Sequence, residues 1–112
     1  MELVLALLIG HAFADYPLQG DFIARFKSYR EKFDGPAGPV MVWPYVLSAH
    51  ALIHAGFVWA ITGSVWLGVC ELVAHWIIDL LKCGDWIDFH ADQWMHIGCK
   101  LLWVVVLIGG VS

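Results

Sequence analysis

The sequence predicts an all-α integral membrane protein: an antiparallel bundle of four transmembrane helices, with an amphipathic interfacial helix between the first two spans. Apolar residues make up 61% of its 112 residues, whereas soluble domains contain roughly 45–50%. Residues 46–70 contain no Asp, Glu, Lys or Arg, and ~20 mostly apolar residues let a helix cross a hydrocarbon core of ~30 Å. We therefore expect a single integral membrane domain over residues 1–112. Since the chain has only six Lys and Arg residues, we expect no nucleic-acid partner.

Four apolar segments are the predicted spans, at about residues 2–18, 40–61, 64–82 and 91–111. The first is similar to a secretory signal, because Ala12, Phe13 and Ala14 form the pattern of a cleavage site. However, the segment has no basic start and carries Glu2, so we expect it to be retained as a span. Pro17 is expected to end or kink this helix, because proline removes a backbone hydrogen bond.

The breaks between the later spans carry residues that are typical of helix ends. Gly63 suits the C-cap of the second span, and Ser64 suits the N-cap of the third. This short break predicts a tight antiparallel hairpin of two helices. Gly84 and its neighbours are expected to separate the third span from the fourth in the same way.

Residues 20–34 are predicted to form a helix that lies in the membrane interface. Its aromatic and aliphatic residues fall near one face, and its four basic residues fall largely elsewhere, as in other interfacial helices. Those basic residues are Arg25, Lys27, Arg30 and Lys32. Residues 34–39, with the sequence DGPAGP, are predicted to be a loop.

The basic residues of this segment also orient the chain. Loops rich in Lys and Arg tend to stay in the cytoplasm, and the break at residues 62–64 carries neither. We therefore expect a multi-pass protein with both termini outside the cytoplasm.

Every predicted span carries polar side chains at four-residue spacing, which places them on one helix face. These lines are His11, Asp15 and Gln19; His50 and His54; Glu71, His75 and Asp79; and Asp92, His96 and Lys100. An acid at the centre of a membrane helix costs ~2.5–3.5 kcal/mol. The acids therefore need compensation inside the bundle, from basic partners, water or a metal ion.

Alternating helix directions predict two layers of these side chains. One layer contains His11, His54, His75 and His96. The other, one turn nearer the cytoplasm, contains Asp15, His50, Asp79 and Asp92.

Imidazole and carboxylate groups in these layers are the ligands of zinc, manganese and non-haem iron, and helix bundles build such sites from facing helices. The predicted metal ligands are His11, Asp15, His50, His54, His75, Asp79, Asp92 and His96. We favour zinc as the divalent metal, with iron or manganese as alternatives. We expect one or two ions, because the set exceeds the three or four ligands of one zinc ion. Asp–His hydrogen bonding without a metal is the structural alternative.

The combined motifs HxxxDYxLQ, HxxxH, HxxxDxxK and DQxxH occur at residues 11–19, 50–54, 75–82 and 92–96. Together they resemble a domain-of-unknown-function family of short bacterial and phage membrane proteins. The resemblance covers nearly the whole chain, and it implies a multi-span protein of the bacterial inner membrane without an assigned activity. More loosely, the pattern is similar to membrane-bound metal-dependent hydrolases.

The metal site and this looser similarity predict a metal-dependent hydrolase. Glu71 or Asp92 is the predicted catalytic base, because a spare carboxylate can accept a proton from an activated water. A site at membrane depth suits a membrane lipid or a lipid-linked phosphate as the substrate. The predicted substrate-binding residues are Lys27, Lys82, Gln19 and Gln93. Alternatively, the two lysines serve only as positive charges that orient the chain in the membrane.

Three other functions stay open. The histidine spacing at residues 50–54 matches the histidine boxes of membrane di-iron oxidases. The same polar lines suit proton or divalent-cation transport, for which such a short chain would need to form a homo-oligomer. The metal can also be purely structural, in which case its coordination is closed. Glu71 is either a base above the metal or the partner of Lys100, and His90 is expected to be an interfacial residue rather than a ligand.

Overall fold

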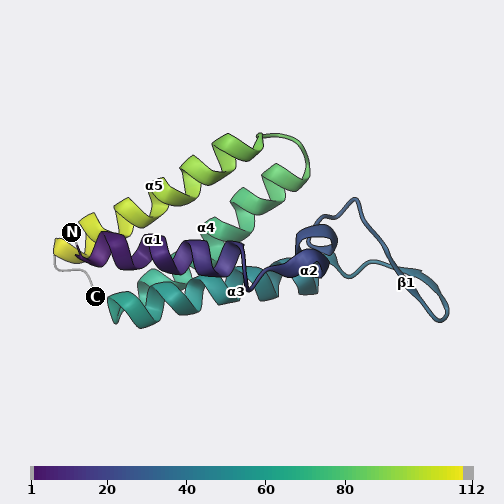
Figure 1. Cartoon of the computed structure of the whole chain (residues 1–112), viewed down its shortest axis with the longest axis horizontal. Coiled ribbons are helices and arrows are strands. Elements are labelled where there is room, and N and C mark those ends of the chain that lie inside the picture. The colour runs from purple at the N-terminus through teal and green to yellow at the C-terminus, as the bar shows by residue number, and fades with distance from the viewer. Residues whose placement is uncertain (1, 110–112) are drawn as a thin grey trace.

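The computed structural model describes residues 2–109 and is mostly helical (Figure 1). Its elements in chain order are α1 (Glu2–Asp15), α2 (Gly20–Phe26), β1 (Phe33–Gly35), β2 (Gly38–Val40), α3 (Trp43–Thr62), α4 (Val65–Cys83) and α5 (Phe89–Ile108). The predicted end of the fourth span at residue 111 lies outside the described residues.

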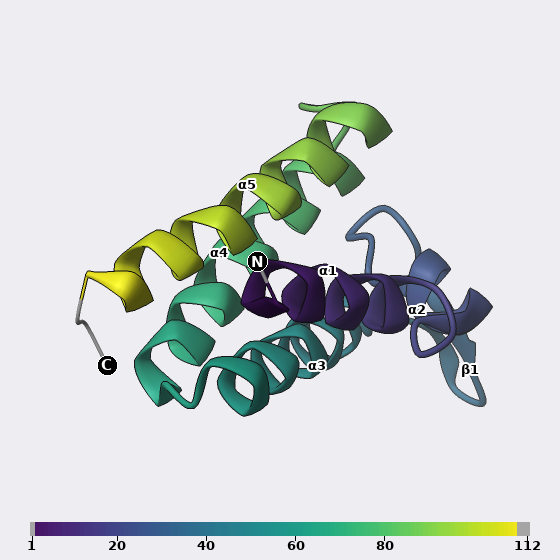
Figure 2. The same ribbon diagram turned by 60° about the vertical axis from the view of Figure 1, so that its left-hand side comes forward.

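The four long helices enclose the interior of the molecule. α3 packs against α1 and α4, and α5 packs against the other sides of α1 and α4. The helices therefore form a closed ring in the order α1, α3, α4, α5. Figures 1 and 2 show α4 and α5 as a pair inclined to α1 and α3, with α2 and the hairpin at the end of the molecule opposite the start of α1.

The predicted hairpin between α3 and α4 is confirmed. Gly63 ends α3 in a left-handed conformation with φ 73°, and the Ser64 hydroxyl accepts a hydrogen bond from the Leu67 amide at 3.2 Å. The second break differs from the first. Gly84 has φ −85°, and Asp85 takes the left-handed conformation instead, with φ 60°. A short polar side chain tolerates this conformation better than most residues do.

The predicted interfacial helix at residues 20–34 is too long. α2 ends at Phe26, and the predicted loop is part of a short antiparallel hairpin in which Phe33 pairs with Val40. The two prolines of DGPAGP lie in this hairpin, well after the end of α2, and Gly38 turns the chain at φ 118°. The apolar face nevertheless exists, because the rings of Phe22, Phe26 and Phe33 lie within 4.9–6.0 Å of one another.

Within residues 2–109, two helices, α3 and α5, are long and apolar enough to cross a membrane. A third span exists if α1 and α2, which meet at 85°, are counted together. α1 alone has 14 residues, about 21 Å at 1.5 Å per residue, which is short of a hydrocarbon core of ~30 Å. α4 is longer, but it carries three charged residues, Glu71, Asp79 and Lys82. The prediction of four spans is therefore not confirmed.

Compared with a soluble domain, this protein buries many polar side chains and exposes many large hydrophobic ones. Among the described residues, 11 polar or charged side chains are buried, the same number as apolar ones, while Leu5, Ile9, Trp66 and Ile108 are among many exposed large hydrophobic residues. Soluble proteins almost never bury unpaired charges. The arrangement suits a molecule whose outer surface faces lipid.

A small apolar cluster closes the interior at the end where α1 begins and α5 ends. It consists of Leu7, Val58, Leu67, Trp103 and Val104. The polar side chains occupy the remainder of the interior, toward α2.

Candidate metal centre

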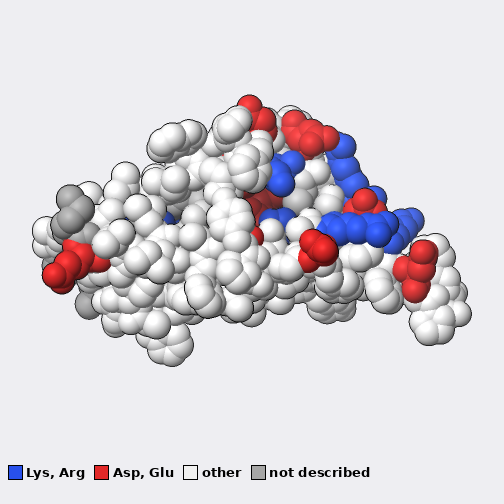
Figure 3. Space-filling model, viewed as in Figure 1, with Lys and Arg blue, Asp and Glu red and all other residues white. Residues whose placement is uncertain are grey.

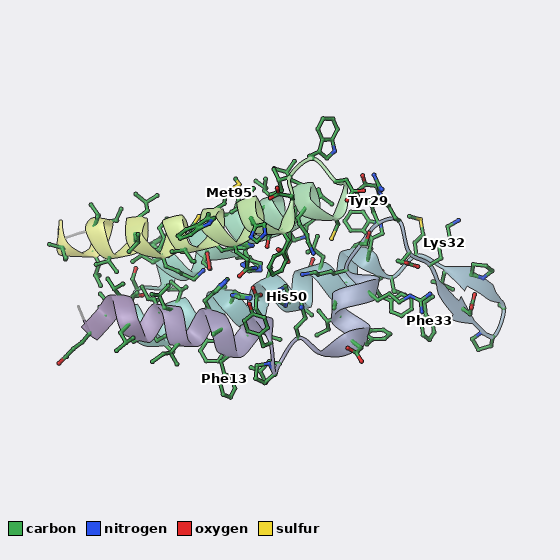
Figure 4. The ribbon with its side chains drawn as sticks, turned by 45° about the horizontal axis from the view of Figure 1, so that its top comes forward. Phe13, Tyr29, Lys32, Phe33, His50 and Met95 are labelled. Carbon is green, nitrogen blue, oxygen red and sulfur yellow. The ribbon has the colours of Figure 1, made fainter. Side chains whose placement is uncertain are left out.

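Five imidazole rings from all four long helices meet in the interior. The ring centroids of His54 and His75 are 3.7 Å apart, and those of His75 and His96 are 4.1 Å apart. His11 lies 5.2 Å from His54, and His50 lies 5.0 Å from His75. The predicted layer of four histidines is therefore present, and His50 adjoins it. Figure 4 shows His50 in the interior, whereas Phe13 and Met95 point outward.

All five imidazoles turn Nε2 toward a carboxylate. The Asp15 carboxylate lies 2.8 Å from His54, 3.3 Å from His50 and 3.3 Å from His11. The Asp79 carboxylate lies 3.1 Å from His96, 3.4 Å from His75 and 3.4 Å from His50. These two acids, from α1 and α4, are thus the points on which the histidines converge.

Most of these separations suit shared metal ligation better than hydrogen bonding. Two atoms ~2.1 Å from one zinc ion at the tetrahedral angle are about 3.4 Å apart, whereas an ordinary N–H···O bond is ~2.9–3.0 Å long. His50 Nε2 and His75 Nε2 both lie 3.4 Å from Asp79 Oδ2, and neither makes a hydrogen bond within the described residues. Asp–His hydrogen bonding alone would leave these buried nitrogens unsatisfied, at a cost of ~1–3 kcal/mol each.

In the part of the chain that the structure describes, two groups of side chains have the geometry to hold an ion. Asp15, His50, His54 and His75 form one group, and His75, Asp79 and His96 form the other; within each group all ligand atoms lie within 4.8 Å of one another. Six of the eight predicted metal ligands are therefore gathered in these groups. His75 belongs to both, and one imidazole nitrogen ligates one ion. The arrangement is therefore compatible with one ion, or with two neighbouring ions of which only one is bound by His75.

The two other predicted ligands, His11 and Asp92, border these groups. Asp92 Oδ1 lies 3.3 Å from His96 Nε2, and His11 Nε2 lies 3.3 Å from Gln93 Oε1. The Gln93 amide donates to Asp15 at 3.2 Å and to Asp92 at 3.1 Å. Gln93 thus joins α1 to α5, a role that the sequence did not reveal.

His90 is exposed in the first turn of α5 and belongs to neither group. This position agrees with its expected exclusion from the ligands.

Glu71 lies on the side of the histidines away from the Asp15 and Asp79 carboxylates. It accepts a hydrogen bond from Lys100 through Oε1 and one from Trp103 Nε1, 3.4 Å away, through Oε2. Of the two roles left open by the sequence, the structure thus places Glu71 as the partner of Lys100. Its Oε1 also lies 3.9 Å from His75 Nδ1.

Lys27, the residue after α2, reaches into the same interior. Its ammonium donates to Gln19 Oε1 at 2.7 Å and to Asp79 Oδ2 at 3.0 Å, and the side chain is only 7% exposed. The contact between Lys27 and Asp79 joins residues 52 positions apart. No spacing rule in the sequence predicts it, because it depends on the 85° turn between α1 and α2.

A polar cavity of about 100 Å³ opens beside the carboxylates. Its lining residues are Asp15, Tyr16, Gln19, Lys27, Asp79, Lys82, Phe89, Asp92 and Gln93. All four predicted substrate-binding residues therefore face one cavity together with three carboxylates. Tyr16 and Phe89 are exposed, so the cavity reaches the surface. In Figure 3, most charged side chains of the visible face gather toward the end of the molecule that carries α2 and the hairpin.

One family model, described as "Protein of unknown function (DUF3307)", matches residues 3–110. Neither the curated proteins nor the solved structures include a match.

Proposed function

This chain belongs to the DUF3307 family of proteins of unknown function, and from its own site we propose that it is a membrane-embedded metal-dependent hydrolase. The observation that carries the proposal is the polar cavity, because it touches Asp15, Asp79 and Asp92 at the edge of the candidate metal centre. Structural zinc sites are closed, whereas catalytic sites keep one position open for water or substrate. An open edge therefore favours catalysis over a purely structural metal.

The proposed ligands are the two groups that share His75. Zinc is the favoured ion, since nitrogen and carboxylate ligands in a buried site suit it, and iron and manganese are the alternatives. A divalent ion held by these residues would supply an acidified water, with a pKa of ~7, and would polarise the group that is to be cleaved.

Asp92 is the favoured general base. It lines the cavity, it belongs to neither ligand group, and its buried Oδ1 makes no hydrogen bond within the part of the chain that the structure describes. Glu71, the other candidate, is held by Lys100 and Trp103 away from the cavity. Its Oε1 lies 3.9 Å from His75 Nδ1, which is too far for a hydrogen bond, so we assign Glu71 to the buried pair with Lys100 and not to the reaction.

The proposed substrate is a membrane lipid or a lipid-linked phosphate. The exposed apolar surface of the four long helices suits a position within the bilayer, and the cavity lies toward the end that carries α2 and most basic residues. We further propose that all four long helices cross the inner membrane, with both termini outside the cytoplasm. The bundle would then deliver a head group to the cavity while the acyl chains stay in lipid.

Transport is the less favoured function. The interior carries a line of ionisable groups from Lys27 through Asp79 and His75 to Glu71 and Lys100, as proton relays do. However, the apolar cluster around Leu7, Val58 and Trp103 packs across the interior beyond this line. A path through one copy of the chain would have to cross that cluster.

The test begins with the full-length protein, purified in detergent without chelators, and with its metal content measured by elemental analysis. We expect about one or two equivalents of a transition metal in the wild type, and loss of it in His75→Ala and Asp79→Ala. His90→Ala is the matched control and should retain the metal. Wild-type protein that binds no zinc, iron or manganese, even after incubation with each, would overturn the proposal.

A further inference from the structure

We propose that the polar cavity is a phosphate-binding subsite, in which Lys82 and the remaining N–H of Lys27 bind the oxygens of a phosphate ester. This inference rests on the proposed function and narrows its substrate class from membrane lipids and lipid-linked phosphates to phosphate esters.

Lys27 has one hydrogen-bond donor to spare. An ammonium group has three N–H donors and no acceptor. Two of them are directed at Gln19 Oε1 and Asp79 Oδ2, at 2.7 and 3.0 Å. Because the side chain is only 7% exposed and lines the cavity, its third N–H has to be satisfied from inside the cavity.

Of the two lysines that line the cavity, Lys82 is the one without an ion pair among the described residues. Its ammonium lies 5.8 Å from the Phe89 ring, and it forms no ion pair within residues 2–109. By contrast, Arg30 is engaged with Asp85 at 2.7 Å, and Arg25 lies 3.6 Å from Glu31. A half-buried lysine that faces a cavity without a partner is suited to an anionic ligand.

The charge of the cavity favours an anion once the metal centre is filled. Three carboxylates and two ammonium groups line it, and histidines that ligate a metal are neutral. A single divalent ion therefore makes the net charge positive. A neutral carboxylic ester would leave Lys82 without a charged partner, whereas a phosphate ester supplies several anionic acceptors for Lys82 and for the third N–H of Lys27.

The size of the cavity restricts the ligand to a head group. About 100 Å³ is well below the ~300–1,000 Å³ of pockets that enclose a whole small molecule. A phosphoryl group fits there, and the remainder of the ligand has to extend past the exposed Tyr16 and Phe89. That remainder is either the apolar part of a lipid or the organic part of a water-soluble phosphate.

The first experiment measures the binding of inorganic phosphate to metal-loaded, full-length protein in maltoside micelles by titration calorimetry. Lys82→Met should weaken binding at least tenfold. The matched control is Lys32→Met, because Lys32 is exposed near the hairpin and does not line the cavity (Figure 4). It should bind within twofold of the wild type. Equal phosphate affinity in the Lys82→Met variant, or no phosphate binding by wild-type protein that holds its metal, would overturn the inference.

The second experiment separates the two sources of phosphate by competition. Displacement of bound phosphate by phosphatidic acid in the micelles, but not by glycerol phosphate, assigns the subsite to a lipid head group. The reverse result assigns it to a water-soluble ester, and displacement by neither contradicts the inference. Metal analysis of the same samples distinguishes failure of this inference from failure of the proposed function. Loss of metal from wild-type protein counts against the metal centre itself.

Discussion

Lys100 of α5 donates a hydrogen bond to Glu71 of α4 inside the bundle, where these side chains are 2% and 0% exposed. The pair lies between the histidines and the apolar cluster, since Glu71 also contacts His75 on one side and Trp103 on the other. A charge enclosed in this way is stable only while its partner is present. The pair therefore joins α4 to α5 and places a carboxylate oxygen 3.9 Å from His75 Nδ1.

Loss of Lys100 should be costly because it leaves Glu71 as an unpaired buried charge. We expect Lys100→Met to destabilise the protein by about 3–5 kcal/mol, measured by unfolding in mixed micelles of increasing denaturing-detergent content. Addition of Glu71→Gln to this variant should recover a large part of the loss. A double variant no more stable than the single one would show that the pair is not the source of the effect.

Removal of metal should lower the stability of wild-type protein but not that of a variant that lacks a metal ligand. A ligand at 100 times its Kd stabilises a folded protein by about 2.7 kcal/mol. We expect a chelator to lower the thermal unfolding midpoint of wild-type protein, and added zinc to restore it. The midpoint of His75→Ala should not respond to either treatment. A chelator-sensitive midpoint in that variant would mean that metal binds elsewhere in the chain.

Asp92→Asn should separate metal binding from catalysis. The variant keeps the shape of the side chain and leaves both ligand groups intact, so metal content should stay at the wild-type level. Loss of a general base typically costs about 10²–10⁴-fold in rate, and a drop of this size is expected in phosphate-ester hydrolysis. Asp34→Asn, at an exposed hairpin position, is the matched control. Full activity in Asp92→Asn would exclude Asp92 as the base.

Close packing of α3 and α4 depends on Gly68. A Cβ at this position would lie 3.1 Å from Trp59 Cβ and 3.2 Å from the Ala55 carbonyl oxygen. Gly68→Ala should therefore destabilise the protein by about 1–3 kcal/mol, the usual cost of overpacking. Gly56→Ala offers a control in the same helix pair, because nothing lies within 4 Å of its Cβ. It should be neutral or stabilising by up to about 1 kcal/mol, through helix propensity, and equal effects at both positions would disprove the packing argument.

The histidine layer could be predicted because it depends on local rules. Four-residue spacing fixes which face of each helix is polar, and alternating helix directions then bring His11, His54, His75 and His96 to one level. The break at Gly63 and Ser64 was predictable for a similar reason, since cap residues act within a few positions of themselves. These features require no knowledge of how distant segments approach one another.

Other features depend on distant segments and could not be predicted. The contact of Lys27 with Asp79 requires the turn between α1 and α2, and composition alone does not reveal that turn. The convergence of Nε2 atoms on two carboxylates depends on side-chain rotamers. The prediction of four spans is not confirmed, because the polar residues that make α4 part of the site also reduce its apolar character and because α1 is short.

The pairing of charges between helices has a consequence for biosynthesis. Asp15 of α1 depends on α3 for two of its three histidine partners, and Glu71 of α4 finds its lysine partner, Lys100, on α5. A helix released into lipid as soon as it is made would carry an uncompensated acid, at ~2.5–3.5 kcal/mol. We therefore expect nascent helices to be retained at the insertion machinery until their partners emerge, so that the protein enters the membrane as an assembled bundle rather than helix by helix.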